Sequence, residues 1–184
     1  DQFFDRTTRR ASTFFGEGLV AHVSFADPTC DRLGGVLYQA GQETGARMHR
    51  GGTYLCIEGP QFSTRAESRI YRSWGVQVIG MTNLQEAKLA REAEMCYATM
   101  ALVTDYDVWH ETEEDVSVEA VVAVLMQNVK TARAILRRAV ALVPAERSCP
   151  CAHALRDAIL TAPDRVPPAL RRKLAPIVGR YLGA

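Results

Sequence analysis

The chain has 184 residues, of which 47% are apolar and 23% are charged, and its formal net charge is +1. This length suits one domain with a hydrophobic core. The near-neutral charge excludes the basic field that attracts nucleic acid or anionic lipid. Because the apolar runs are far shorter than a membrane span and no signal peptide is recognisable, we expect no nucleic-acid partner and no membrane partner.

The first half of the chain predicts alternating strands and helices. Its first eighteen residues are predicted to be a loop. Apolar runs and turn residues then predict a strand at Leu19–Ala26, a helix from Asp31, as a candidate N-cap, to Gly45, and a strand at Gly52–Ile57.

The next elements continue the alternation. Thr64 and Glu67 have the spacing of a capping box, so a helix is expected from Arg65 to Trp74, ending at Gly75. The chain then predicts, in order, a strand at Val76–Gly80, a helix capped by Asn83 and running to Ala93, and a strand at Cys96–Val103.

The last part of the chain is predicted to be helical. Ser117 can cap a long helix, and two short helices separated by Pro163–Pro168 are expected to close the chain. The long helix carries an apolar stripe at helical spacing, formed by Val118, Val121, Val122, Leu125, Val129, Ala132, Leu136 and Val140.

This order of elements predicts an α/β layered fold with a mostly parallel central mixed sheet flanked by helices. A domain that starts with a loop and has three or four strands behind it is short of its first elements. In open α/β sheets, ligands bind beyond the carboxyl ends of the strands, and three predicted strands end in polar segments there.

The segment "LVTDYDVW" places Asp105 and Asp107 after an apolar run. Unpartnered carboxylates are costly to bury, so one interpretation is a pair that faces a ligand. A second interpretation is two solvated loop acids or a turn cap. A third is a D-x-D site for a divalent cation with oxygen ligands.

The segments "IEGPQFSTRAES" and "GMTN" also follow predicted strands and precede helices. Glu58 can bind hydroxyl groups, Phe62 can stack on a ring, and a helix start offers N–H groups to an anion. Thr82 can bind a phosphate oxygen, and Met81 can line a pocket. Taken one at a time, these are ordinary strand-to-helix connections; their joint occurrence at one sheet edge favours a site.

The five cysteines suit reduced thiols in a cytosolic protein. Cys149 and Cys151 with His153 lack a fourth zinc ligand, so a strained disulfide or two free thiols is the preferred interpretation. No histidine lies in a nucleophile motif, and no glycine-rich phosphate motif occurs.

Together, "DQFFDRT", "IEGPQFSTRAES", "GMTN" and "TDYDVW" resemble the methylthioadenosine phosphorylase branch of the trimeric purine nucleoside phosphorylases. The resemblance covers residues 1–143, and residues 144–184 form a helical tail. It implies the C-terminal portion of a single domain, in a cytoplasmic homotrimer of purine and methionine salvage. The family's reaction is phosphorolysis of 5′-methylthioadenosine, with inorganic phosphate as co-substrate and no metal or organic cofactor.

The resemblance also implies roles for individual residues. Asp105 and Asp107 would contact the purine edge, with Asp105 as the acid at N7 and Asp107 at the N6 amino group. Such an acid must be protonated near neutral pH, which burial and a like-charged neighbour favour. The other implied contacts are Phe62 with the base, Met81 and Glu58 with the ribose, Thr82 with phosphate, Thr104 as a pocket residue, and Ser63, Val118, Val121 and Val122 as specificity residues.

The chain departs from the family pattern because the N-terminal part, with its phosphate loop and Arg-His pair, is missing from it. We therefore expect the 184-residue chain alone to be inactive, with that segment as its partner. The alternatives are a phosphorylase for methylthioinosine, inosine or guanosine, and a non-catalytic purine-binding or oligomer-forming module. A metal-dependent D-x-D transferase is a more distant alternative.

Overall fold

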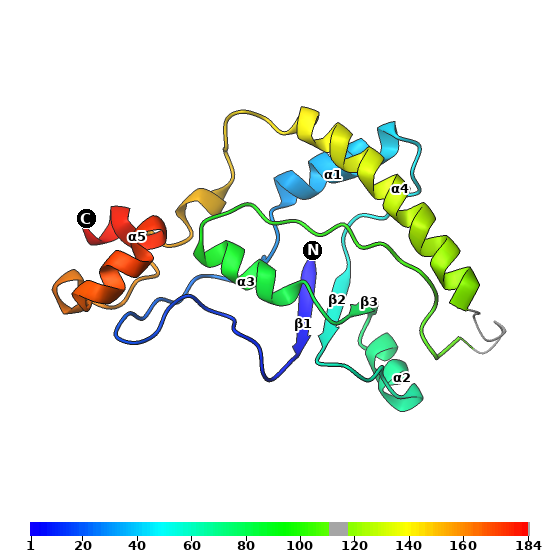
Figure 1. Ribbon diagram of the computed structural model, residues 1–184, viewed down its shortest axis with the longest axis horizontal. Coiled ribbons are helices and arrows are strands. Elements are labelled where there is room, and N and C mark those ends of the chain that lie inside the picture. The colour runs from blue at the N-terminus through cyan, green and yellow to red at the C-terminus, as the bar shows by residue number, and fades with distance from the viewer. Residues whose placement is uncertain (111–117, 184) are drawn as a thin grey trace.

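The computed structural model describes residues 1–110 and 118–183, and the side chains of all these residues except 118–121. The described residues form one sheet of three parallel strands in the order β1 (Gln2–Arg6), β2 (Thr53–Ile57), β3 (Val76–Gly80). The α-helices are α1 (Asp31–Glu43), α2 (Arg65–Ser73), α3 (Leu84–Glu92), α4 (Val118–Leu142) and α5 (Pro168–Leu182). Figure 1 shows the sheet in the middle of the molecule, with α5 at one end and α2 at the other. The expected α/β class with a parallel sheet is confirmed.

Strand β1 corrects the expectation that the first eighteen residues form a loop. Gln2–Arg6 pairs along its whole length with Thr53–Ile57. Phe3 is half-buried and Phe4 is exposed, so this short edge strand has little apolar alternation of its own. Its strand conformation comes from the partner strand, which lies about fifty residues away in the sequence.

Two predicted strands are not strands in the structure. Leu19 is buried, but Leu19–Ala26 forms only isolated bridges, at Gly16–Leu19 and Ala21–Ile159. Residues 96–103 are extended and form no ladder with any described strand. An apolar run becomes a strand only when a neighbour in register pairs with it over several residues, and the described segments make only single backbone hydrogen bonds or isolated bridges with these two runs.

The helix starts agree with the sequence in position but not always in the capping group. Thr64 and Glu67 form the expected capping box, and Gly75 has a φ of +79° just after α2. Helix α1 begins at Asp31 itself, with Cys30 in the N-cap position. Asn83 lies at the N-cap of α3, but its side chain caps no backbone N–H. The expected cap at Ser117 lies outside the described residues.

Helix α4 faces the core with a side that only partly overlaps the predicted stripe. Its buried residues are Ala132, Ile135 and Ala139, of which Ile135 and Ala139 pack against α1 around Ala40. Within the predicted stripe Ala132 is buried and Val129 is half-buried, whereas Val122, Leu125, Leu136 and Val140 are exposed. Because α4 is apolar on several sides, periodicity alone did not identify the side that α1 covers. Among the described residues, no helix is long and apolar enough to cross a bilayer.

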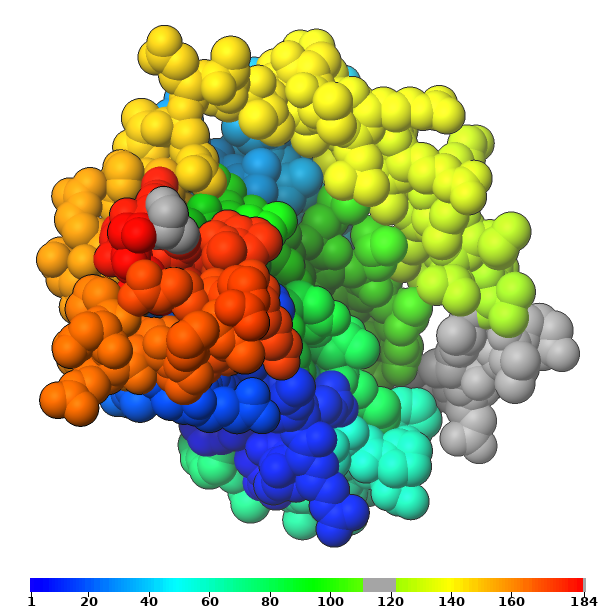
Figure 2. Space-filling model, turned by 60° about the vertical axis from the view of Figure 1, so that its left-hand side comes forward, coloured from blue at the N-terminus to red at the C-terminus, as the bar shows by residue number. Residues whose placement is uncertain are grey.

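The C-terminal tail has a small hydrophobic core of its own. Short 3₁₀ helices at Pro150–His153 and Pro163–Arg165 precede α5. The core is formed by Leu19, Leu155, Ala158, Val166, Leu170, Leu174, Val178 and Leu182. In Figure 2 the tail, coloured orange to red, lies against the blue N-terminal segment. The tail therefore packs on the loop that follows β1.

One buried carboxylate joins this tail to the rest of the molecule. Glu94, just after α3, accepts hydrogen bonds from the backbone N–H of Leu155 at 2.9 Å and the hydroxyl of Tyr181 at 2.6 Å. It also forms an ion pair with Arg180. Burial by itself would raise the pKa of the Glu94 carboxyl, but the bonds from Tyr181 and Leu155 and the charge of Arg180 hold this pKa below its ordinary value.

We predict that Glu94→Gln lowers the free energy of unfolding by about 1–3 kcal/mol near neutral pH, because the variant loses hydrogen bonds to a charged acceptor. The folded pKa of Glu94 is depressed, so its ionisation stabilises the fold above the ordinary pKa of 4.5 and ceases to do so as the pH falls through the folded value. The difference between parent and variant should therefore shrink in acid. Urea unfolding near neutral pH and in acid measures this difference, with the exposed Glu146→Gln as control. A difference that is independent of pH would contradict the ionised state assigned to Glu94.

Candidate active site

The ends of the three strands meet at one edge of the sheet. The register pairs Arg6 with Ile57 and Cys56 with Gly80, so the three connections leave the sheet side by side. These connections begin with "TTRR" after β1, "EGP" after β2 and "MTN" after β3. The structure therefore confirms that the segments containing Glu58 and Thr82 converge, and it adds a third connection that the sequence analysis had left in a loop.

Arg10 links these connections through its guanidinium group. Its Nη1 donates to the backbone oxygen of Met81 at 2.6 Å, and its Nη2 donates to the backbone oxygen of Glu58 at 2.8 Å. Sequence reasoning missed Arg10 because its partners lie 48 and 71 residues away. The only signal was its place in a polar segment directly after the motif "DQFFDRT".

Glu58 has partners within this network. One carboxylate oxygen accepts from the backbone N–H of Thr8 at 2.6 Å, and the other lies 3.4 Å from Nε of Arg10. The hydrogen bond from Thr8 and the Arg10 guanidinium lower the pKa of Glu58. Glu58 is thus an ionised group that helps to hold two connections together while its side chain remains partly exposed.

The N-terminus of α3 is open to an anion. Asn83 has a φ of +86°, and its Oδ1 accepts from the hydroxyls of Tyr97 and, at 2.9 Å, Thr99 instead of capping the helix. The first N–H groups of α3 therefore have no side-chain cap, and exposed Thr82 stands directly before them. Backbone N–H groups and the helix dipole favour a negative charge at this position.

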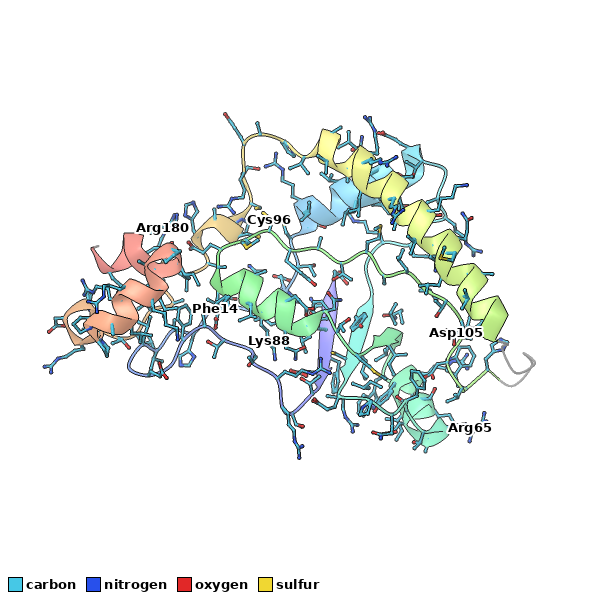
Figure 3. All side chains as sticks on the ribbon, viewed as in Figure 1. Phe14, Arg65, Lys88, Cys96, Asp105 and Arg180 are labelled. Atoms are coloured by element: carbon cyan, nitrogen blue, oxygen red, sulfur yellow. The ribbon has the colours of Figure 1, made fainter. Side chains whose placement is uncertain are left out.

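Contacts with β1 and its connection hold α3 in place. Lys88 donates to Asp5 at 2.6 Å, and Gln85 donates to the hydroxyl of Thr7 at 2.9 Å. Figure 3 shows Lys88 on α3, in front of the strands. The helix start is therefore kept at the sheet edge by side chains on both of its first two turns.

Three buried polar atoms near this edge lack a hydrogen-bond partner within the protein. They are Oγ of Ser63, Nδ2 of Asn83 and Oε1 of Gln85. Leaving such a group unsatisfied costs about 1–3 kcal/mol. Buried polar groups are normally paired, and two of these three, on Asn83 and Gln85, belong to the start of α3, as is typical of a place that binds water or a ligand.

Gly59 and Met81 touch at the same edge. Gly59 has a φ of +72°, and a Cβ atom there would lie 2.8 Å from Sδ of Met81. The positive φ and this close approach both favour glycine at this position. Met81 is half-buried, whereas the side chain of Phe62 is 86% exposed.

The two aspartates differ in their surroundings. Asp107 accepts from the hydroxyl of buried Ser68 at 2.5 Å and from the backbone N–H of Val108 at 2.8 Å. Asp105 accepts from Thr104 and is exposed. The burial expected around Asp105 is therefore absent from the described chain, and the preceding segment is extended rather than a strand.

Helix α2 anchors the segment that carries both aspartates. Arg65 donates to the backbone oxygen of Val108 at 2.5 Å, and the guanidinium of Arg72 lies 3.6 Å from the ring centre of Trp109. Figure 3 shows Asp105 and Arg65 at the same end of the molecule, below α4. Asp107 is held by this helix, and Asp105 is placed beside it.

The remaining predicted residues lie on α4. Val122 is half-exposed, whereas the side chains of Val118 and Val121 lie outside the described part of the structure. Around Asp105 and Asp107, no third ligand-type side chain among the described residues comes close enough for a metal site. The geometry thus offers an anion position at α3 and two carboxylates near α2.

Comparisons with known proteins identify the family of the chain. The sequence profile of the phosphorylase superfamily matches residues 1–141. The chain is 59% identical over 183 residues to the S-methyl-5′-thioadenosine phosphorylase of Geobacter sulfurreducens and 57% identical over 183 residues to that of Koribacter versatilis. These matches cover 99% and 100% of the chain but 64% and 63% of the relatives. The chain therefore spans a little under two thirds of their length.

Solved structures show the same similarity. A methylthioadenosine phosphorylase from an Antarctic soil metagenomic library superposes with a TM-score of 0.90 at 45% identity, covering 96% of this chain and 63% of that one. The methylthioadenosine phosphorylase of Schistosoma mansoni in complex with adenine gives a TM-score of 0.72 at 36% identity, covering 79% of this chain and 58% of that one.

We predict that Arg10→Ala loosens the sheet edge, because two backbone oxygens lose a charged donor. The free energy of unfolding should fall by about 1–3 kcal/mol. Amide hydrogen exchange should become faster at residues 58–62 and 81–85. The control is Arg9→Ala, which removes an exposed arginine next to it; equal exchange in the two variants would show that Arg10 does not hold the connections.

Proposed function

The chain belongs to the phosphorylase superfamily, and from this premise we propose that it is the purine-binding part of an enzyme that phosphorolyses 5′-methylthioadenosine. The observation that carries the proposal is the pair Asp105 and Asp107, of which Asp107 is hydrogen-bonded to α2, together with the uncapped start of α3, which offers an anion position. The identities to relatives with this activity support it. The products are adenine and 5-methylthioribose 1-phosphate.

The reaction exchanges one bond at the anomeric carbon. A phosphate oxygen forms the new bond to this carbon, and the bond to N9 of adenine breaks with its electron pair moving onto the base. Adenine leaves readily only if N7 takes up a proton. In the proposal Asp105 donates this proton as a general acid and regains one from solvent.

Asp107 has the surroundings of a hydrogen-bond acceptor. Ser68 and Val108 already donate to its two oxygens, and a carboxylate has further lone pairs for the N6 amino group of adenine. Asp105 receives one side-chain donor, from Thr104. Because the acid must be protonated, the proposal requires the bound purine and the rest of the enzyme to bury Asp105.

The other predicted contacts complete the proposed site. Phosphate binds at Thr82 and the first N–H groups of α3. Met81 and Glu58 face the ribose, and Phe62 covers the base. Ser63 and the α4 residues Val118, Val121 and Val122 select the base and the 5′-group, with Thr104 beside them.

We also propose a cytoplasmic homotrimer that uses phosphate and no metal or organic cofactor in the reaction. The support for the location is the five free cysteines. The support for assembly is the amount of exposed apolar surface, which includes Phe62, Leu125 and Val140. A phosphorylase for methylthioinosine, inosine or guanosine is the nearest alternative, and a purine-binding module without catalysis is the second. The exposure of Asp105 and Phe62 favours the latter for residues 1–184 alone.

We predict that residues 1–184 alone give no phosphorolysis, because Asp105 is exposed and the described phosphate contacts are few. We expect a hybrid protein, in which residues 1–184 replace the matched 183 residues of the Geobacter sulfurreducens relative, to be active. It should also have the mass of a trimer in light scattering. The assay is steady-state release of adenine from methylthioadenosine. Turnover by residues 1–184 alone would contradict the first expectation, and an inactive but folded hybrid that binds adenine would favour the binding module.

In the active hybrid, Asp105→Asn should lower kcat/KM for methylthioadenosine by about 10²–10⁴-fold, because an amide cannot donate the proton that N7 needs. The control is Asp157→Asn, an exposed change in the tail. Near-normal activity of Asp105→Asn would disprove the acid role. A preference of the parent hybrid for inosine would disprove the adenine assignment, and dependence on added Mg²⁺ or Mn²⁺ would favour the D-x-D alternative.

A further inference from the structure

Four of the five cysteines converge at one point away from the candidate active site. The Sγ atoms of Cys30, Cys96, Cys149 and Cys151 all lie within 4.8 Å of one another. They come from the N-cap of α1, the segment after α3 and the start of the tail. Figure 3 places Cys96 near α1 and the tail, on the opposite side of the molecule from Asp105. In the sequence, Cys149 and Cys151 lie close to His153, but no fourth zinc ligand lies near them.

The spacing of these four sulfur atoms suits a tetrahedral metal site. A Zn–S bond of about 2.3 Å places the sulfur atoms of a tetrahedral tetrathiolate about 3.8 Å apart. The Sγ atoms of Cys96 and Cys149 are 3.2 Å apart, and all other pairs are within 4.8 Å. Small side-chain rotations bring all four to the required distance. We propose that Cys30, Cys96, Cys149 and Cys151 bind one zinc ion as a closed structural site.

The surroundings of the cluster support a metal held by thiolates. Cys30 and Cys151 are 4% and 3% exposed, whereas Cys96 and Cys149 are half-buried. A pocket of about 330 Å³ reaches Cys30, Cys96 and Cys149 from the surface and gives an ion an entry path.

The charge around the cluster is also favourable. Four thiolates and one Zn²⁺ carry a net charge of −2, and Arg32 and Arg147 line the same pocket. Cys30 lies at the N-cap of α1, where the helix dipole favours a negative group. One carboxylate, that of Glu146, lines this pocket against the two arginines, so the charged side chains of the lining are net positive.

Disulfide bonding is the alternative chemistry of the same four atoms. Two disulfides would draw the sulfur atoms into two pairs, each about 2.05 Å apart. The structure instead holds four free thiols around one centre. Four sulfur ligands in tetrahedral geometry select zinc or an iron–sulfur cluster, and the separations within the group suit a single ion. The one-residue spacing of Cys149 and Cys151 is shorter than usual for zinc, but their sulfur atoms still lie within the required range.

A zinc ion here would fasten the tail to the core. It would join α1, the segment after α3 and residues 149–151, next to the contacts of Glu94 with Leu155 and Tyr181. Because the proposed site contains no residue of the candidate active site, its role is structural. Loss of the metal is therefore expected to loosen the tail first.

The test is the metal content of the 184-residue chain and of the full-length hybrid, purified without chelators and measured by inductively coupled plasma mass spectrometry. We expect about one zinc per chain in each protein. Cys30→Ser and Cys151→Ser should lower the content to below about 0.2 per chain. The matched control is Cys56→Ser, which changes a buried cysteine outside the cluster and should keep its zinc.

Two further measurements on the parent protein test the proposal even if the serine variants fail to fold. The chelated parent protein titrated with Co²⁺ should develop the absorption bands of a tetrahedral tetrathiolate at one equivalent. Mass spectrometry after alkylation without reduction should label the four cluster cysteines only once the metal is removed. Parent protein with no zinc and no cobalt bands, or with disulfides between these cysteines, would overturn the proposal, and iron and sulfide in place of zinc would do so as well.

Discussion

The candidate active site depends on one guanidinium group, that of Arg10. Parallel pairing of three short strands brings their ends together, but it leaves each following connection free to take its own course. Arg10 removes this freedom by donating to the backbone oxygens of Glu58 and Met81. Because a charged donor to two backbone acceptors is strong and directional, the connections after β2 and β3 keep a fixed separation. The positions of Gly59 and Met81, and of the α3 N-terminus behind them, follow from that separation.

The candidate active site has two different electrostatic environments, one at the start of α3 and one beside α2. At α3, Thr82 and a helix start that has no side-chain cap favour an anion, because Asn83 bonds to Tyr97 and Thr99 instead of capping the helix. At α2, the donors around Asp107 favour an acceptor role for its carboxylate. The proposed phosphorolysis would use this division, since phosphate must approach one side of the sugar while the base leaves with a proton on the other.

The tail is attached by polar contacts as well as by apolar packing on the segment around Leu19, because the shared core is small. Eight buried side chains form that core, and a structure of this size gains limited stability from hydrophobic burial alone. Glu94 supplies one attachment through Leu155, Tyr181 and Arg180. The four-cysteine cluster lies close to it and joins the same segments to α1. Both attachments lie away from Asp105, so the contacts that hold the tail are separate from the proposed nucleoside site.

The sequence by itself determined the α/β class, the capping box at Thr64 and strands β2 and β3, because these depend on residues close together in the chain. The convergence of Glu58 and Thr82 followed from the expected parallel sheet, in which strand ends meet at one edge. Only the tertiary structure decided that Gln2–Arg6 is a strand, that residues 96–103 are not, and that α4 buries Ile135 instead of Leu136. It also decided the roles of Arg10 and the grouping of the cysteines. These outcomes depend on partners that lie tens of residues away in the sequence. A local pattern shows that a segment tends to pair or to bury one surface, but it does not show which distant segment will be its partner.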